Sequence, residues 1–318
     1  MKDILVSVIT PVFNEQESLP VFFERVTAIM ESMGEPYEII AVNDGSKDKS
    51  AEIIREHCKN DPRIKTVEFS RNFGQQAAFL CGLEYCSGKC AILIDADLQD
   101  PPELFPEMLK KWREGYEVVH GVRKVRKGET FFKKLTSKAF MHVLSSSSGI
   151  NLPDNSGEFK LYDRKVIDAV LSLPERSRYL RIQTAFVGFK EAFVEFDRSE
   201  RELGKTKFTL KKMLKTAEAG IIPYSKKPLT LSLKLGVMLN ICSIAAFIVF
   251  IVLAATGNGL PLTAWLFPSL GLCTSLTLIA IGVAGVYLGY AYDEAKHRPI
   301  YIVREKINFG ETADGKRG

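Results

Sequence analysis

Residues 91–103 read AILIDADLQDPPE, a short apolar run followed at once by a cluster of acidic and amide side chains. Such a run is typical of a buried strand, so the polar residues lie where that strand reaches the surface. Asp95, Asp97 and Gln99 offer hard oxygen ligands, and Mg²⁺ or Mn²⁺ usually takes one or two such groups while it keeps positions for substrate phosphates. The alternative is an acidic loop in which Asp100 caps a helix that Pro101 begins. Taken alone, this stretch does not decide between the two.

On both sides of this stretch, strand and helix patterns alternate along the sequence. β-branched runs bounded by turn residues predict strands, and apolar residues at helical spacing predict helices. The expected strands are 6–10, 37–42, 64–69, 91–94 and 117–121, and the expected helices are 18–33, 49–59, 75–85 and 104–114. This alternation predicts an α/β fold with a mostly parallel sheet covered on both faces. In such sheets ligands bind beyond the carboxyl ends of the strands.

The residues that follow the predicted strands are of the kinds that bind ligands. TPVFNE (10–15), NDGS (43–46) and SRNFG (70–74) follow the first three strands. Each is also ordinary turn chemistry, but the sheet brings all of them to one edge. No GxGxxG follows the first strand and no GxxxxGK[ST] occurs, which disfavours dinucleotide oxidoreductases and P-loop NTPases. We expect Asp44 to accept a hydrogen bond from an N–H of a nucleobase, and Glu15 and the turn Pro11-Val12-Phe13 to pack beside that base. The acidic cluster would hold a metal ion on a diphosphate.

The last third of the chain is apolar. No charged residue occurs from Leu235 to Tyr292, whereas Lys and Glu are frequent before it. Because one crossing takes about 20 apolar residues, this length fits two membrane-spanning helices, expected at 235–256 and 262–290. Two buried helices of a soluble protein are the alternative. Lys and Arg flank the outer ends and are missing from the turn between the helices, so the positive-inside rule places both ends in the cytoplasm.

A basic segment precedes the apolar region. From Arg201 to Lys234 there are nine Lys or Arg and only two Glu, and apolar residues recur at helical spacing between Leu210 and Ile221. This pattern predicts an amphipathic helix that lies on anionic headgroups, with a helix packed on its own domain as the alternative. The start of the chain shows no signal segment, so we expect the large domain in the cytosol. The expected organisation is a cytosolic domain, a juxtamembrane segment, two membrane helices and a cytosolic tail, at 1–205, 206–228, 229–292 and 293–318.

Eight segments of the chain, in order, resemble one family of enzymes. They are TPVFNE (10–15), NDGSKDKS (43–50), FSRNFG (69–74), DADLQDPPE (95–103), HGVRKVRKGETFFKKLTSK (120–138), DNSGEFKLYDRKV (154–166), RELGKTKF (201–208) and AKHRPIYIV (295–303). The first four are similar to the GT-A glycosyltransferases of family 2. The rest, with the paired apolar spans, resemble the polyisoprenyl-phosphate hexose synthases, among them bactoprenol glucosyltransferases and, more distantly, dolichol-phosphate mannose synthase. The similarity covers almost the whole chain.

The resemblance implies an inverting enzyme of the cell (inner) membrane that transfers one hexose from a nucleotide diphosphate sugar to a polyprenyl phosphate. UDP-glucose and undecaprenyl phosphate are the expected substrates, for modification of cell-envelope glycans, with UDP-GlcNAc, UDP-galactose and GDP-mannose left open. It also implies a homo-tetramer and no nucleic-acid partner. Carried onto this sequence, it implies nucleotide binding by Pro11, Phe13, Glu15, Asp44, Asp95 and Ala96; metal binding (Mg²⁺ or Mn²⁺) by Asp95, Asp97 and Gln99; and catalytic roles for Asp97, Glu158, Arg123, Lys134, Arg201 and Lys207, of which the four basic residues face the acceptor phosphate.

Two positions depart from the family pattern. Where the family usually has GDF this chain has Gly157-Glu158-Phe159, and where it often has GxSK this chain has GKTK at 204–207. Threonine keeps the hydroxyl of serine. Glu158 adds one methylene, which moves its carboxylate by about 1 Å, and misplacement of that order can cost about a hundredfold in rate. A catalytic and a structural role for Glu158 both stay open.

Two rival functions remain to be weighed. A processive polysaccharide synthase shares the same core and also has membrane spans, but such synthases carry a QxxRW element that this sequence lacks. A non-catalytic membrane protein that binds nucleotide sugars is the second rival. The intact acidic strand ends speak against it, because a protein that had lost its chemistry would be expected to lose them. Transfer of a single sugar is therefore the function that the sequence favours.

Overall fold

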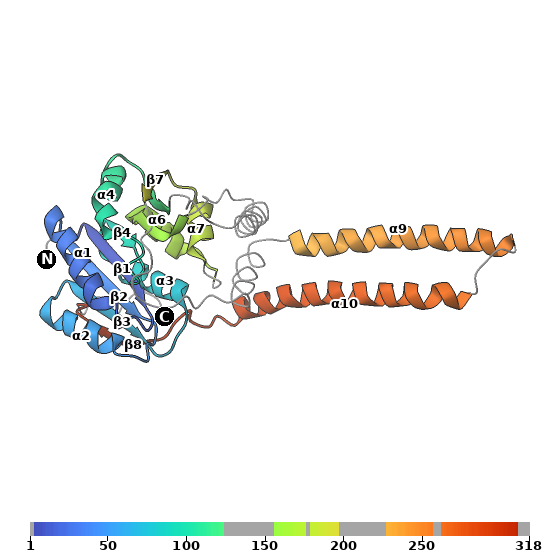
Figure 1. Ribbon diagram of the computed structural model, residues 1–318, viewed down its shortest axis with the longest axis horizontal. Coiled ribbons are helices and arrows are strands. Elements are labelled where there is room, and N and C mark those ends of the chain that lie inside the picture. Colours follow the sequence, from blue (N-terminus) through green and yellow to red (C-terminus); the bar gives the residue numbers. More distant parts are fainter. Residues whose placement is uncertain (1–2, 124–155, 176–178, 197–226, 257–261, 311–318) are drawn as a thin grey trace. The chain divides into compact units, whose positions relative to one another are not determined.

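The computed structural model describes residues 3–123, 156–175, 179–196, 227–256 and 262–310. These residues fall into two compact units, which we describe separately. The first contains a β-sheet with its helices and also the described chain after residue 298. The second contains the two long C-terminal helices (Figure 1).

The first unit follows the predicted alternation closely and adds further elements. In chain order the elements are β1 (Val6–Val12), α1 (Leu19–Met33), β2 (Tyr37–Asn43), α2 (Ser50–Asn60), β3 (Ile64–Phe69), α3 (Gln75–Tyr85), β4 (Cys90–Leu93), the 3₁₀ helix η1 (Pro102–Leu104), α4 (Phe105–Arg113), β5 (Val118–Arg123), β6 (Ser156–Asp163), α6 (Arg164–Ser172), α7 (Leu180–Val187), β7 (Glu191–Phe196) and β8 (Val303–Ile307). All nine strands and helices expected from the sequence are confirmed, with ends that differ by at most two residues. The alternative in which Asp100 caps a helix is wrong, because η1 has Pro101 at its cap and α4 has Leu104.

The described strands form one mixed sheet of eight, in the order β7-β5-β6-β4-β1-β2-β3-β8. Its centre is parallel, as predicted, and Ile9 of β1 pairs with Ile40 of β2 on one side and Leu93 of β4 on the other. β6 runs antiparallel to both β4 and β5. The loops after β1, β2 and β4 therefore leave the sheet at one edge, which is where ligands bind in parallel sheets.

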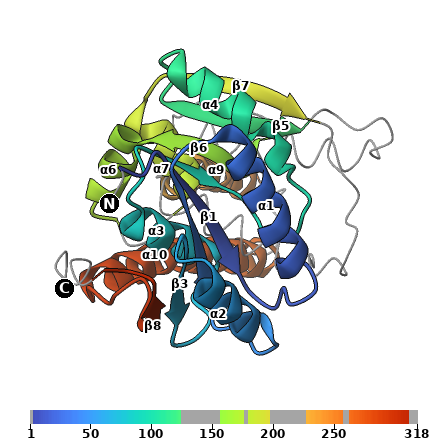
Figure 2. The same cartoon turned by 90° about the vertical axis from the view of Figure 1, so that its left-hand side faces the viewer.

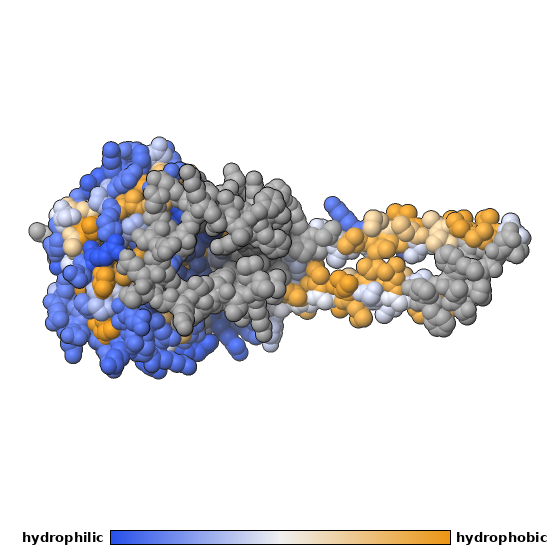
Figure 3. Space-filling model, in the orientation of Figure 1, coloured by the Kyte–Doolittle hydropathy of each residue, from blue (hydrophilic) through white to orange (hydrophobic). Residues whose placement is uncertain are grey.

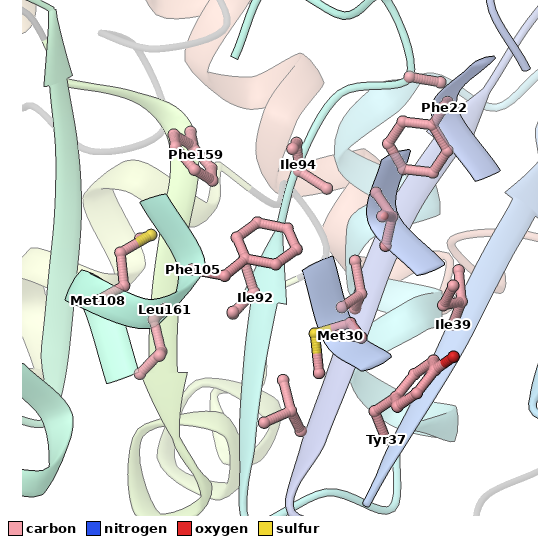
Figure 4. Packing of buried hydrophobic residues seen from close by; sticks show 14 of the residues in the cluster. Phe22, Met30, Tyr37, Ile39, Ile92, Ile94, Phe105, Met108, Phe159 and Leu161 are labelled. Atoms are coloured by element: carbon pink, nitrogen blue, oxygen red, sulfur yellow. The ribbon is translucent and has the colours of Figure 1, made fainter. Parts of the chain in front are cut away.

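Helices cover both faces of the sheet (Figure 2). On one face, α1, α2 and α4 pack on side chains such as Ile39, Ile92 and Phe159. Figure 4 shows part of this cluster, with Phe105 beside Ile92. On the other face, α3, α6 and α7 pack on residues such as Ile9. The contact between α3 and β1 is close, since a Cβ at Gly82 would lie 2.2 Å from Cγ2 of Ile9. Close packing on both faces holds the strand ends in fixed positions.

The chain after the long helices returns to the sheet as β8, which pairs antiparallel with the edge strand β3. Arg55 of α2 bridges Glu68 of β3 at 2.6 Å and Glu305 of β8 at 3.0 Å. The side-chain amide of Asn308 donates to the carbonyl oxygens of Cys58 and Ile64, each at 2.7 Å. Residues that the sequence analysis placed in a C-terminal tail thus complete the sheet and cover its open edge.

The second unit contains α9 (Lys227–Ala255) and α10 (Leu262–Ala295), which run antiparallel beside each other (Figure 1). Within the described residues, both helices are long and apolar enough to cross a membrane: Ser232–Leu253 has a mean hydropathy of 2.6 and Ser269–Ala295 one of 1.9. Their apolar side chains are exposed, and Figure 3 shows them as a mostly hydrophobic surface. Two helices buried in a soluble core would not leave these side chains uncovered, so this alternative loses its support.

Candidate active site

A pocket of about 180 Å³ opens at the carboxyl ends of β1, β2 and β4. Its lining residues are Pro11, Val12, Phe13, Glu15, Asp44, Gln75, Asp95, Ala96 and Asp97. This set contains all six residues expected to bind the nucleotide, together with Asp97. Val12 belongs to the turn that was expected to pack beside the base. Gln75 was missed, because it comes just after the strand-end segment 70–74 as the first residue of a predicted helix. The sheet therefore brings together residues that are distant in the chain, as the strand-end argument predicts.

The turn after β1 is fixed by the turn after β2. The backbone N–H of Asn14 donates to Oγ of Ser46 at 3.1 Å, and Oδ1 of Asn14 accepts from the N–H of Lys47 at 2.8 Å. Asn14 has a φ of 58°, in the left-handed region that asparagine tolerates better than most residues. Phe13, just before it, remains 40% exposed at the pocket. A rigid turn thus presents an aromatic ring on which a planar base can stack.

Asp44 is buried, and its carboxylate organises the turn between β3 and α3. Oδ1 accepts from the N–H of Phe73 at 2.6 Å, while Oδ2 accepts from the N–H of Gly74 at 2.9 Å and from the amide of Asn72 at 2.8 Å. Burial raises the pKa of Asp44, and the two backbone N–H groups oppose that shift. A carboxylate has about four acceptor positions, so these bonds leave room for a further donor from a ligand. Asp44 therefore has a structural role beside any ligand contact.

Asp95 and Asp97 flank the pocket from the loop after β4. Oδ1 of Asp95 accepts from Nε2 of Gln75 at 2.6 Å, and Oδ1 of Asp97 accepts from the N–H of Gln99 at 3.1 Å. Leu98, which lies between Asp97 and Gln99 in the chain, has a backbone φ of 60°, a strained value for a leucine. The side chain of Gln99 is not among the residues that line the pocket.

The loop fits a divalent cation by its chemistry. Desolvation by burial, together with the negative charges of Asp97, Asp100 and Glu158, raises the pKa of Asp95 to about 7. Such a concentration of carboxylates is stabilised when a cation enters. Among the described residues, no group of three acidic, His or Cys side chains forms a complete metal site. In proteins, Mg²⁺ is commonly bound by one or two carboxylates, and water and phosphate oxygens occupy its remaining coordination positions.

Glu158 lies near this loop, on β6. Lys160 of β6 pairs with Leu93 of β4, and continuing that antiparallel register places Glu158 opposite Asp95. Lys160 is fully buried on the same face of β6 as Glu158, and burial lowers its pKa while the charge of Glu158 opposes the shift. His120 of β5 pairs with Lys160, and burial lowers its pKa although Glu191 lies 3.5 Å from its Nε2. Glu158, Lys160 and His120 thus form a set of neighbouring ionisable groups on β5 and β6.

The four basic residues expected at the acceptor phosphate are placed only in part. Arg123 ends β5, and its Nη2 lies 3.3 Å from Oδ1 of the buried Asp100. This ion pair ties β5 to the acidic loop after β4. Lys134, Arg201 and Lys207 lie outside the described residues, so their expected roles stay predictions.

The sheet, the pocket at its carboxyl edge and the acidic loop define an α/β domain with a binding site at its strand ends. The model of glycosyl transferase family 2 matches residues 7–171. The chain belongs to that family and is a glycosyltransferase.

Relatives match nearly the full chain. An uncharacterized glycosyltransferase of Bacillus subtilis, YkcC, is 45% identical over 302 residues, covering 94% of this chain and 93% of the relative. The bactoprenol glucosyl transferase of Shigella phage SfV is 34% identical over 303 residues, covering 95% and 98%. The prophage bactoprenol glucosyl transferase homolog of Escherichia coli is 34% identical over 300 residues, covering 94% and 98%.

A solved structure shares the fold. Glucosyl-3-phosphoglycerate synthase from Mycobacterium tuberculosis, in complex with Mn²⁺, UDP and phosphoglyceric acid, superposes with a TM-score of 0.51 at 17% identity, over 69% of this chain and 76% of that one. This similarity supports the GT-A architecture predicted from the sequence.

Proposed function

We propose that the protein transfers one hexose, preferably glucose, from a UDP-sugar to a membrane polyprenyl phosphate, with inversion at the anomeric carbon. The observation that carries the proposal is the pocket, where residues from three strand ends gather beside two acidic side chains. The full-length similarity to bactoprenol glucosyl transferases supports glucose and the lipid acceptor. GlcNAc, galactose and mannose are the alternative sugars.

The nucleotide half of the donor fits the part of the pocket between β1 and β2. Phe13 offers an exposed ring for the base, and Pro11 and Glu15 line the pocket beside it. Asp44 is held rigidly by its bonds to Asn72 and to two backbone N–H groups, so it can present a remaining acceptor position to an N–H of the base without reorganising. The diphosphate then lies toward Asp95, Ala96 and Asp97.

A divalent cation held by Asp95 and Asp97, with Gln99 as the third expected ligand, would neutralise the charge that develops on the departing nucleoside diphosphate. The chain's own residues orient the reactants. An oxygen of the lipid phosphate forms a bond to the anomeric carbon as the bond from that carbon to the diphosphate oxygen breaks, and the electron pair leaves with the nucleotide. Since the acceptor is already an anion, it needs charge pairing more than a strong base, and Arg123, Lys134, Arg201 and Lys207 supply it in this proposal.

The two apolar helices support a membrane location for the acceptor reaction. We infer that α9 and α10 cross the inner membrane, with the sheet domain in the cytoplasm and the basic segment 201–234 at the headgroups. Assembly as a homo-oligomer, with a tetramer expected, belongs to the same proposal. So do the domain boundaries at residues 205, 228 and 292.

The test is a donor panel. Membranes containing the full chain are incubated with undecaprenyl phosphate and labelled UDP-glucose, UDP-GlcNAc, UDP-galactose or GDP-mannose, and label in the lipid extract is measured. We expect a lipid-linked monosaccharide, formed fastest from UDP-glucose. A polymer would support a processive synthase, and no product from any donor would support a non-catalytic binding protein; either result contradicts the proposal.

A further inference from the structure

Helix α3 begins with two successive glutamines, and each contacts a different acidic residue of the site. Nε2 of Gln75 donates to Oδ1 of Asp95 at 2.6 Å. Nε2 of Gln76 donates to Oε1 of Glu158 at 3.3 Å. The turn before them already binds Asp44 through Gly74 and its neighbours. One segment of chain therefore contacts three carboxylates: two that follow β2 and β4, and one within β6.

Both ends of the Gln76 side chain are engaged. While its Nε2 faces Glu158, its Oε1 accepts from the backbone N–H of Leu180 at 2.9 Å. Leu180 is the first residue of α7, so this bond satisfies one of the N–H groups that a helix leaves open at its start. The two partners also fix the orientation of the amide, because turning it over would set an oxygen against the carboxylate and a donor against an N–H. Gln76 thus connects α7, α3 and β6.

Within the described part of the chain, one of the two carboxylate oxygens of Glu158 is unsatisfied. Its Oε2 is buried and has no hydrogen-bond partner among the residues that the structure describes. A buried carboxylate oxygen without a donor carries a desolvation cost, which a ligand hydroxyl or N–H can remove. By the strand register Glu158 lies opposite Asp95, which lines the pocket, and the charge of Glu158 acts on the carboxyl group of Asp95. The oxygen that Gln76 does not hold is therefore the one left for a ligand.

We propose that Gln76 is a positioning residue for the sugar transfer: it holds one oxygen of Glu158 so that the other faces the reacting sugar beside Asp95. The inference rests on the proposed function and adds a residue to it. An amide suits this task, because it donates a hydrogen bond without neutralising the carboxylate, as a lysine or arginine would. A glutamate in its place would repel Glu158. A shift of about 1 Å in a positioned group can lower the rate about a hundredfold.

The test is a double-mutant cycle on the purified full chain in detergent. Gln76→Glu keeps an oxygen that accepts from Leu180 but replaces the donor to Glu158, so it disturbs one contact selectively. It is compared with Glu158→Gln and with the double variant. Gln16→Glu is the matched control, since Gln16 also accepts from a backbone N–H, that of Lys49 at 3.1 Å, and its side chain lies outside the pocket lining. We measure kcat, KM for the UDP-sugar, and the apparent Tm of all five proteins.

We expect Gln76→Glu to lower kcat by about 10-fold to 100-fold with KM within about twofold of the wild type, because the nucleotide pocket is untouched. In the Glu158→Gln background the same change should lower kcat by less than about threefold, since its target is gone. Gln16→Glu should leave both constants unchanged. An equal loss of kcat in both backgrounds, or no loss at all, would overturn the proposal.

The thermal data separate this inference from the proposed function. If the wild type makes no lipid product, the proposed function fails. The Tm values of the double-mutant cycle then test the contact between Gln76 and Glu158 by themselves. A Tm loss from Gln76→Glu that becomes smaller in the Glu158→Gln background supports the contact. Equal Tm losses in the two backgrounds contradict it.

Discussion

Replacing Asp44 by asparagine should destabilise the protein even when no nucleotide is present. The change turns one carboxylate oxygen into an NH₂ group, while the site offers three donors, from Asn72, Phe73 and Gly74. Whichever way the new amide turns, at least one partly buried backbone N–H loses its acceptor, which costs about 1–3 kcal/mol. Removing a desolvated charge offsets part of this cost, since burial raises the pKa of Asp44. We expect a net loss of about 2 kcal/mol.

The assay is thermal unfolding of the full chain in detergent, without ligand. For a domain of about 150–250 residues, 2 kcal/mol corresponds to a Tm lower by about 4–8 °C. Glu15→Gln is the matched control in the same pocket: Oε2 of Glu15 accepts from the hydroxyl of Ser18 at 3.0 Å, and a hydroxyl can turn to suit either group. Its Tm should change by less than about 2 °C. An unchanged Tm for Asp44→Asn, with only KM for the donor raised, would show that Asp44 acts on the ligand alone.

Three further changes test other parts of the structure. Asp97→Ala should abolish turnover at any metal concentration while the protein stays folded and membrane-bound, and undiminished transfer would refute the assignment of Asp97 as a metal ligand. Gly82→Ala places a Cβ 2.2 Å from a methyl group of Ile9 and should cost about 1–3 kcal/mol in chemical denaturation, whereas Gly285→Ala in α10, with no neighbour within 4 Å, should not destabilise. Burial holds the pKa of His120 below its usual 6.5, so the unfolded chain binds this proton more readily and stability falls as the pH drops below 6.5. Between about pH 7.5 and 5.5, the Tm of His120→Gln should therefore fall less than that of the wild type, and equal losses would show that His120 is not held neutral by the fold.

The sequence predicts the parallel centre of this fold because its signals are local. The run Ile92-Leu93-Ile94 is buried on both faces and is followed by polar residues, and both properties are visible in the residues themselves. The pocket residues could be found for the same reason, since each follows a strand and parallel strands end at one edge. Local patterning therefore accounts for most of the pocket lining.

Contacts between distant segments could not be predicted in this way. β8 pairs with β3 across two long helices, and its sequence alternates weakly, so no local pattern assigns its partner. The bonds from Gln76 to Glu158 and Leu180 depend on the packing of α3 against β6 and α7. The turn held by Asp44 is similar, because an aspartate at a strand end is equally typical of a ligand contact and of a turn.

The most direct test of the central claim is the mass of the lipid product. Purified wild-type chain is incubated with UDP-glucose, a divalent cation and undecaprenyl phosphate, and the extracted lipid is analysed by mass spectrometry beside a reaction with Asp97→Ala. The account predicts a lipid heavier by one hexose in the wild-type reaction and unmodified lipid with the variant. Unmodified lipid in both reactions, or a lipid that carries several hexoses, would contradict it.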